Sequence, residues 1–429
     1  MYQKTVLPNG VRIISLPMKE RSSVAVGMMI NAGGRLENDR VKGAAHFLEH
    51  IVFKGSRKFS CSQIKEMIEG VGGSLNAFTA EERTCYYAKV PAEHLRRTFN
   101  VLADMVLAPS IRQSDVDRER TVIMEELKMY HDLPHYYVLD LLDRLIWPGH
   151  PLGKSLIGTM DSITKMSAKD LHGFRQTHYG PGQIVIAVCG HLRHKDVVAL
   201  TRRAFGTCRS RPPVESVAVD NRQQKSRAMF APRTIEQMHL ALGMSGFQQG
   251  HPDRYILNLL NIILGGNMSS RLFHEIREKR GLAYSIATGV KYLSDTGLFL
   301  VRAGVDGRKI SETVDLIVKE FAKIKRRGVP PGELRRAKDY YIGQLRLGLE
   351  DTLDHMLWMA ESIVSLGRVR LLKDIVDDVN KVRSRDLQRV AREVFKDSRL
   401  NLAVVGPVTN RQERALQGMM DFERLPPPD

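Results

Sequence analysis

The 429-residue sequence contains only four cysteines, and no two of them have the spacing Cys-x-x-Cys. So few cysteines exclude a disulfide scaffold, which depends on several paired cysteines in a short secreted chain. The four are Cys61, Cys85, Cys189 and Cys208. We expect them to be reduced, mostly buried thiols, as is usual in a cytoplasmic protein.

The sequence also lacks long hydrophobic runs. Apolar stretches such as YILNLLNIILGG, residues 255–266, are shorter than the roughly 18 apolar residues of a membrane span. The N-terminal segment has no basic region followed by an apolar core of about 7 to 15 residues, so we expect no secretion signal. These absences predict a soluble chain with a cytoplasmic location and no membrane partner.

Acidic residues are fewer than basic ones, with 48 Asp and Glu against 65 Lys and Arg, which gives a formal net charge of +17. This charge permits contact with polyanions or acidic peptides. The basic residues are scattered in helical patterns, as in FAKIKRRGV at 321–329, and form no compact basic tail. No nucleic-acid module is recognisable, so we expect a solvated basic surface and no specific nucleic acid.

The length predicts two or three domains. A segment rich in Pro, Ser and Arg, at 208–228, divides the chain nearly in half. We therefore predict a first domain at 1–212, a linker at 213–228 and a second domain at 229–429.

The order of predicted elements repeats in the two halves. Each half contains two strands followed by a long amphipathic helix, at 75–107 and at 284–321. Each half also ends with an apolar strand and a glycine, at 182–192 and at 399–408. The pattern predicts an α+β fold with two homologous domains, each a mainly antiparallel sheet covered on one face by helices.

The motif His46-Phe47-Leu48-Glu49-His50 carries the strongest chemical signal. On a helix that Gly55 is expected to end, His46, Glu49 and His50 share one face. Histidines at i and i+4 can bind one zinc ion, and the carboxylate between them can hold and deprotonate a metal-bound water. The alternative is a hydrogen-bonded histidine pair with a salt-bridged glutamate.

A third ligand is predicted in the helical segment 114–132. Glu119, Val122, Ile123 and Glu126 share one face there, and Glu125 points away. The Glu126 carboxylate would complete a His-His-Glu site with a fourth position for water. Glu119 could orient a ligand imidazole or could be an ordinary solvated carboxylate.

Other histidines are weaker metal-ligand candidates. Three of them, His131, His135 and His150, are expected in a loop-like segment.

Four stretches together resemble the M16 zinc peptidases, the family of pitrilysin, insulin-degrading enzyme and the mitochondrial processing peptidase. They are HFLEHIVFKG, GGSLNAFTAEERTCYYAKV, VIMEELKMY and HPLGKSLIGT. The resemblance runs from about residue 2 to residue 410 and is closest in form to the short bacterial processing-peptidase-like branch. It implies the LuxS/MPP-like metallohydrolase fold.

The family pattern is HxxEH followed about 76 positions later by Glu, and that position is Glu126. The resemblance therefore implies that His46, His50 and Glu126 bind one Zn²⁺ per chain. It also implies that Glu49 is the general base and that Glu119 matches a further acidic position on the ligand helix.

The resemblance also implies how a substrate is held. The strand at 74–79, with Asn76, Ala77 and Phe78, would pair as an edge strand with an extended peptide. An ordinary buried strand is the alternative. Arg277 and Tyr284, seven residues apart, would donate hydrogen bonds to the oxyanion of a tetrahedral intermediate. Without the family, they would be a surface salt-bridge arginine and a tyrosine in a sheet.

The predicted function is a zinc-dependent endopeptidase, of the inverzincin type, that hydrolyses extended or unfolded peptides. The alternative is a non-catalytic scaffold subunit like those family members that became core proteins of a respiratory complex. The second half contains no HxxEH, and the chain is half as long as the four-domain relatives. A homodimer, or a heterodimer with a related subunit, is therefore expected to complete the substrate chamber.

Overall fold

The computed structural model describes residues 1–427, which form two compact units. The first unit comprises Met1–Lys128, Ser155–Val217 and Arg346–Val369. The second comprises Met129–Lys154, Ala218–Leu345 and the described chain from residue 370 onward. Each unit therefore contains a segment from the other half of the sequence, unlike the single boundary predicted at 213–228.

The predicted linker is largely without regular structure, since residues 209–224 contain no helix or strand. The first strand of the second unit begins at Arg227, one residue before the predicted end of the linker.

The first unit is built on a six-stranded mixed sheet. Its spatial order is β1 (Gln3–Val6), β2 (Arg12–Pro17), β6 (Ile184–Gly190), β3 (Ser23–Ile30), β5 (Thr84–Pro91) and β4 (Ser74–Thr79). Only β2 and β6 run parallel, and the other neighbouring strands of this sheet are antiparallel. Strand β4 pairs with β5 on one side only, so it forms an edge of the sheet.

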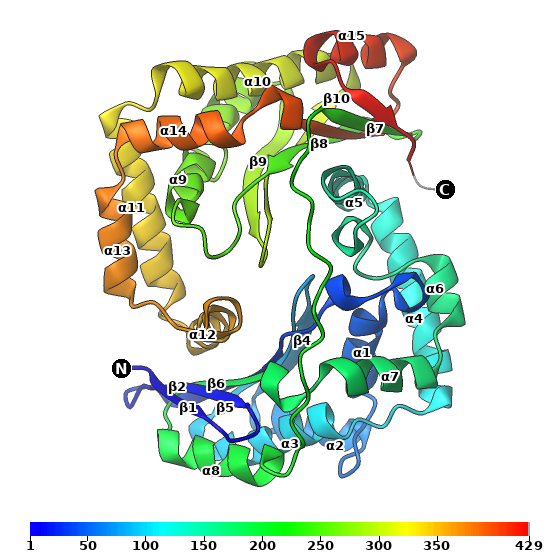
Figure 1. Cartoon of the computed structure of the whole chain (residues 1–429), viewed down its shortest axis with the longest axis vertical. Coiled ribbons are helices and arrows are strands. Elements are labelled where there is room, and N and C mark those ends of the chain that lie inside the picture. The colour runs from blue at the N-terminus through cyan, green and yellow to red at the C-terminus, as the bar shows by residue number, and fades with distance from the viewer. Residues whose placement is uncertain (428–429) are drawn as a thin grey trace. The chain divides into compact units, whose positions relative to one another are not determined.

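Different helices cover the two faces of this sheet. Side chains alternate along β3, so that Val26 packs on one face and Ala25 on the other. The Val26 face carries α3 (Leu95–Leu107) and α8 (His194–Phe205), and the Ala25 face carries α12 (Thr352–Leu366) (Figure 1). The expected helical layer is confirmed, and α12 adds a second layer that the sequence did not reveal.

A glycine in β3 lets α12 approach the sheet closely. A Cβ atom at Gly27 would lie only 2.3 Å from Met356 Sδ. Met356 is fully buried on this face together with Met359, Ala360 and Ile363.

The first unit also contains α1 (Ala44–Val52) and the start of α4 (Gln113–Asp132), which carry the predicted site. Three further helices belong to it: α2 (Cys61–Ile68), α6 (Met160–Lys165) and α7 (Ala168–His178).

Five strands of the second sheet repeat the topology of the first, and the sixth, β12 (Glu423–Leu425), differs from β1 because it pairs parallel with its neighbour. The order of the second sheet is β12, β7 (Arg227–Pro232), β11 (Asn401–Gly406), β8 (Gln237–Ser245), β10 (Gly297–Asp306) and β9 (Ala283–Tyr292). Strands β7 and β11 are parallel, as β2 and β6 are, and β11, β8, β10 and β9 are successively antiparallel. The predicted α+β class with two homologous domains is therefore confirmed.

One face of the second sheet packs against α5 (Pro134–Ile146), which buries Leu141 and Leu142 there. Gly243 in β8 resembles Gly27 in β3, because its Cβ would lie 2.9 Å from a methyl carbon of Leu142. The remaining helices of this unit are α9 (Arg254–Leu264), α10 (Ile310–Arg327), α11 (Pro331–Gly348), α13 (Leu372–Lys381), α14 (Ser384–Val394) and α15 (Asn410–Met420).

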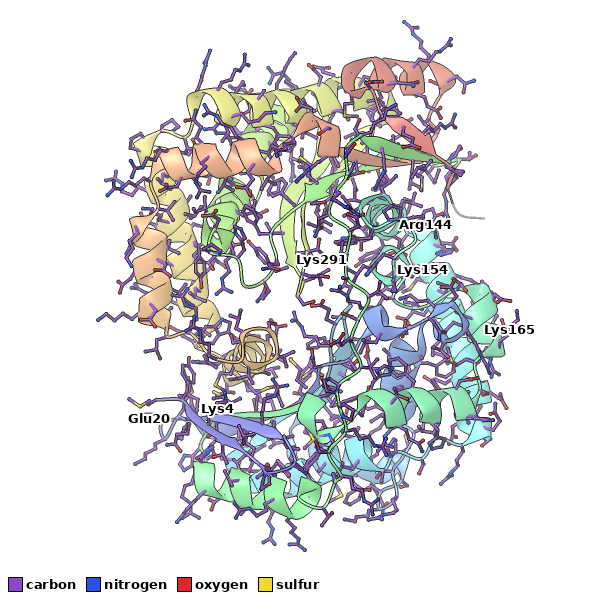
Figure 2. All side chains as sticks on the ribbon, in the orientation of Figure 1. Lys4, Glu20, Arg144, Lys154, Lys165 and Lys291 are labelled. Atoms are coloured by element: carbon purple, nitrogen blue, oxygen red, sulfur yellow. The ribbon has the colours of Figure 1, made fainter. Side chains whose placement is uncertain are left out.

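Charged side chains are spread over the outside of the chain. Lys165 and Glu20, both labelled in Figure 2, lie at the periphery of the view. Lys165 pairs with Asp161 at 2.6 Å while both side chains remain largely exposed. Among residues 1–427, every helix is too short or too polar to cross a lipid bilayer.

We expect Met356→Ala to lower the free energy of unfolding by about 2–5 kcal/mol, because it opens a cavity between α12 and the first sheet. The measurement is urea denaturation followed by circular dichroism. Met268→Ala is the matched control, since Met268 is 76% exposed, and it should change stability by less than about 0.5 kcal/mol. Equal midpoints for the two variants would contradict the packing of α12 described above.

Candidate metal centre

Helix α1 begins at a buried carboxylate. Glu37 accepts hydrogen bonds from the backbone N–H groups of Gly43, at 3.0 Å, and Ala45, at 2.7 Å. Its negative charge also pairs with Lys42 at 3.1 Å. A carboxylate at this end satisfies free N–H groups and complements the helix dipole. The start of the helix that carries the motif is therefore fixed.

The predicted two-sided character of α1 is confirmed. Phe47, Leu48, Ile51 and Val52 are fully buried, while His46, Glu49 and His50 are partly accessible. The predicted end was wrong, because the helix stops at Val52. Gly55 lies beyond it, in a bridge with Ser60 that leads into the next loop.

Helix α4 meets α1 through a chain of charged hydrogen bonds. His50 Nδ1 lies 2.9 Å from Glu119 Oε1, and Lys54 Nζ lies 2.5 Å from Glu119 Oε2. Glu119 is buried, so it is not the solvated carboxylate that the sequence left open. This bond leaves His50 Nε2 available to a metal, and such an outer partner typically orients a ligand imidazole. Lys54 is a contact that the sequence did not reveal.

The face of α4 that carries Glu119 and Glu126 includes fewer buried residues than the sequence predicted. Ile123 is buried with Glu119, but Val122 is 51% exposed. Glu125 points away as predicted and pairs with Lys128 at 2.6 Å.

The other nitrogens of the two imidazoles face Glu126. Glu126 Oε2 lies 3.8 Å from His46 Nε2 and 3.5 Å from His50 Nε2. Two ligand atoms each about 2.05 Å from zinc at the tetrahedral angle are roughly 3.3 Å apart. One donor atom from each of the three residues lies within 4.8 Å of the others. The donor set and its spacing therefore fit a zinc ion.

The pKa values of the two imidazoles shift in opposite directions, and the shift of His46 favours metal binding. Burial lowers the pKa of His46 to about 3, and the neighbouring His50 adds to the effect. The His46 ring is therefore neutral at physiological pH and keeps a lone pair for a metal. Burial would also lower the pKa of His50, but the hydrogen bond to Glu119 and the charge of Glu126 outweigh it and raise the pKa.

Glu49 is held by the edge strand of the sheet. Thr79, the last residue of β4, donates from Oγ1 to Glu49 Oε2 at 2.6 Å. Burial raises the pKa of Glu49, and this hydrogen bond partly opposes the rise. Thr79 is the last residue of the strand predicted at 74–79, but nothing in the HxxEH motif indicated that it would contact the Glu49 carboxylate.

The stretch predicted to bind substrate does form an edge strand. Asn76 is exposed, and Ala77 and Phe78 are partly accessible. The Ala77 N–H donates to Asn76 Oδ1 at 2.8 Å. The alternative of an ordinary buried strand is therefore wrong.

Arg277 and Tyr284 come together in the second unit. Arg277 lies in a π-helix, Phe273–Glu278, and its guanidinium carbon is 5.8 Å from the centroid of the Tyr284 ring. Both line a cavity of about 450 Å³ that also includes Arg302. Within residues 1–427 Arg277 makes no ion pair, unlike a surface salt-bridge arginine. Tyr284 is the second residue of the edge strand β9 and is 75% exposed.

Two histidines expected in a loop are helical instead. His131 lies in the last turn of α4, and His135 lies in the first turn of α5. The short break between these helices, at Leu133, misled the prediction.

Comparison with known proteins supports the sequence resemblance. Residues 12–160 match the family model described as Insulinase (Peptidase family M16), and residues 165–341 match that described as Peptidase M16 inactive domain. The sequence is 33% identical to the uncharacterized zinc protease YmxG of Bacillus subtilis over 413 residues, which cover 96% of this chain and 99% of that protein. The chain belongs to the M16 peptidase family.

Another relative and two solved structures match this chain over nearly their full length. An uncharacterized zinc protease of Streptomyces coelicolor is 35% identical over 421 residues, 96% of this chain and 91% of that protein. The crystal structure of a protease from Helicobacter pylori superposes with a TM-score of 0.90 at 25% identity, covering 94% of this chain and 99% of that one. A structure titled peptidase M16 inactive domain, from Pseudomonas fluorescens, shares the fold with a TM-score of 0.88 at 18% identity, covering 95% of this chain and 98% of that one.

We expect Glu119→Gln to weaken zinc binding by about 10- to 100-fold, because a neutral amide no longer supports the His50 imidazole or pairs with Lys54. Competition with a chromophoric chelator measures the affinity. Glu125→Gln removes the same charge from an exposed position on the same helix and should leave the affinity unchanged. Equal affinities for all three proteins would exclude the proposed role of Glu119.

Proposed function

We propose that this chain is a zinc-dependent endopeptidase that cuts extended or unfolded peptides, with one Zn²⁺ held by His46, His50 and Glu126. The convergence of two imidazole nitrogens and one carboxylate, all within 4.8 Å, is the observation that carries the proposal. Three protein ligands with a free fourth position are typical of catalytic rather than structural zinc. The naming of full-length relatives as zinc proteases supports the same choice.

Zinc in this site would polarise the scissile carbonyl and lower the pKa of a water molecule to about 7. The Glu49 carboxylate takes a proton from that water and delivers it to the leaving amine nitrogen. Thr79 donates to Oε2 of Glu49, which orients the carboxylate and leaves Oε1 without this bond. Glu119 keeps the His50 ring in one orientation throughout.

The substrate binds as an added strand along β4. An edge strand offers backbone N–H and C=O groups to any extended peptide, so affinity depends little on sequence. Asn76, Ala77 and Phe78 supply this surface. Since Thr79 continues the same strand and contacts Glu49, a peptide paired there lies beside the general base.

Arg277 and Tyr284 donate hydrogen bonds to the oxyanion that forms on the scissile carbonyl. A guanidinium and a phenol are strong donors for developing negative charge. In the functional protein we propose that a second subunit supplies these donors to the metal centre: an identical chain brings its own Arg277 and Tyr284, and a related chain brings the corresponding residues. The cytoplasmic location remains a prediction.

We expect Glu49→Gln to lower the rate of peptide cleavage by roughly 10²- to 10⁴-fold, because the amide cannot accept the proton of the attacking water. A quenched fluorescent peptide measures the rate. Zinc content, measured by mass spectrometry, should stay near one per chain in both proteins and fall after chelation. Glu66→Gln, at an exposed position on α2, should cleave at the wild-type rate.

Two results would overturn this assignment. If the Glu49→Gln variant cleaved peptide at the wild-type rate, Glu49 could not be the general base. A folded wild-type chain that contains no zinc and cleaves no peptide would instead support the scaffold alternative.

Mixing two inactive variants tests the contribution of the second subunit. We expect Glu49→Gln and Arg277→Ala chains to regain activity when refolded together, because each mixed dimer then contains one complete site. Each variant refolded alone is the control, and cleavage of the same peptide is measured. Absence of recovery in a verified mixed dimer would mean that Arg277 acts within its own chain or has no catalytic role.

A further inference from the structure

The first unit contains a cavity of its own, which is distinct from the metal centre. Its volume is about 780 Å³, and it is formed by the loop between α1 and α2 together with residues 110–112, which precede α4. Five cationic residues line it: Lys54, Arg57, Lys58, Lys65 and Arg112. None of the described residues that line this cavity is acidic.

The cavity walls are held in place by the fold. Gly55 O accepts a hydrogen bond from Ser110 N at 2.9 Å, and Arg57 N donates to Ala108 O at 2.8 Å, so the two loops are joined. The buried carboxylate of Asp104 lies behind the α1–α2 loop and accepts hydrogen bonds from Ser56 Oγ at 2.6 Å and Lys58 N at 2.9 Å. The cationic side chains therefore project from a preformed backbone frame.

Most of the positive charge around the cavity is not neutralised by the protein. Within residues 1–427 the side chains of Arg57, Lys65 and Arg112 make no ion pair or hydrogen bond. Lys58 lies 3.9 Å from Asp104, at the outer limit of an ion pair, and is mostly exposed. Like charges gathered in a concave surface repel one another and attract anions.

We propose that this cavity binds a small polyvalent oxyanion of the phosphate class, in the size range of pyrophosphate or triphosphate. The volume lies within the usual range for small-molecule sites and exceeds what a single phosphate would fill. Arginine guanidinium groups match phosphate oxygens in pairs, and lysines add point charge. The hydroxyl groups of Ser60, Ser62 and Ser110 also line the wall and can donate to further oxygens.

Two features add detail to this site. Helix α2 begins at the cavity wall with Cys61, so its N-terminal N–H groups add to the positive potential there. Phe59 also lines the cavity and offers an apolar surface to a nucleoside attached to the phosphates. Lys54 lines the cavity and also pairs with Glu119 of the metal centre, so we leave it unchanged in the test below.

The test is calorimetric titration of the chelator-treated full chain with inorganic tripolyphosphate, since polyphosphates would otherwise bind zinc. We expect saturable binding at one site per chain. Changing Arg57→Gln and Arg112→Gln together should weaken it by at least about tenfold, because charge-assisted hydrogen bonds are lost. Both side chains are exposed, and circular dichroism checks that the variant is folded.

The matched control is the pair Arg202→Gln and Arg203→Gln, which removes the same charge from an exposed part of α8. It should bind tripolyphosphate as the wild type does. Adenosine triphosphate distinguishes the two sources of the ligand: tighter binding than tripolyphosphate identifies a nucleotide site, and equal binding identifies a site for the phosphates alone.

Three results would overturn the proposal. They are no binding by the wild type, equal weakening in both double variants, and tighter binding of a penta-aspartate peptide than of tripolyphosphate. The last would identify a docking site for acidic peptides instead. Because zinc and peptide cleavage play no part in these measurements, failure here would leave the proposed peptidase activity untouched.

Discussion

The hydrogen bond between His50 and Glu119 connects the two helices on which the candidate site depends. It joins α1 to α4 at 2.9 Å, and Lys54 on the α1 side neutralises the buried carboxylate. An unpaired charge at this depth would be costly, so the three residues stabilise one relative placement of the helices. That placement brings Glu126, two turns further along α4, opposite both imidazole rings. The geometry for zinc follows from this bond.

Each unit completes its hydrophobic core in the same way. In each, a mainly antiparallel sheet receives on its second face a helix from the other half of the chain: α12 on the first sheet and α5 on the second. A glycine in the strand below, Gly27 or Gly243, provides the room. Close packing over both faces makes each sheet rigid, and the edge strand β4 is therefore a fixed support for Glu49.

Several features could be predicted from the sequence because they are local. Helical period placed His46, Glu49 and His50 on one face, and alternation in apolar runs located the central strands. The sheets on which α5 and α12 pack could not be predicted, because an amphipathic pattern shows that one face of a helix is buried but not which sheet covers it. Thr79 and Lys54 were missed for a related reason: their partners, Glu49 and Glu119, lie 30 and 65 positions away. The sequence gives a net charge of +17 but does not show where cationic residues gather. In the fold, some of them line one cavity between the loops that precede α2 and α4.

The sequence by itself determined the chemistry available: an HxxEH motif, a glutamate 76 residues after its second histidine and an excess of cationic residues. Only the tertiary structure decided which of these groups meet. The order of residues sets side-chain direction within one helix or strand, where a few dihedral angles govern geometry. Contacts between distant elements depend instead on how many apolar faces pack together at once, and that is a property of the whole fold.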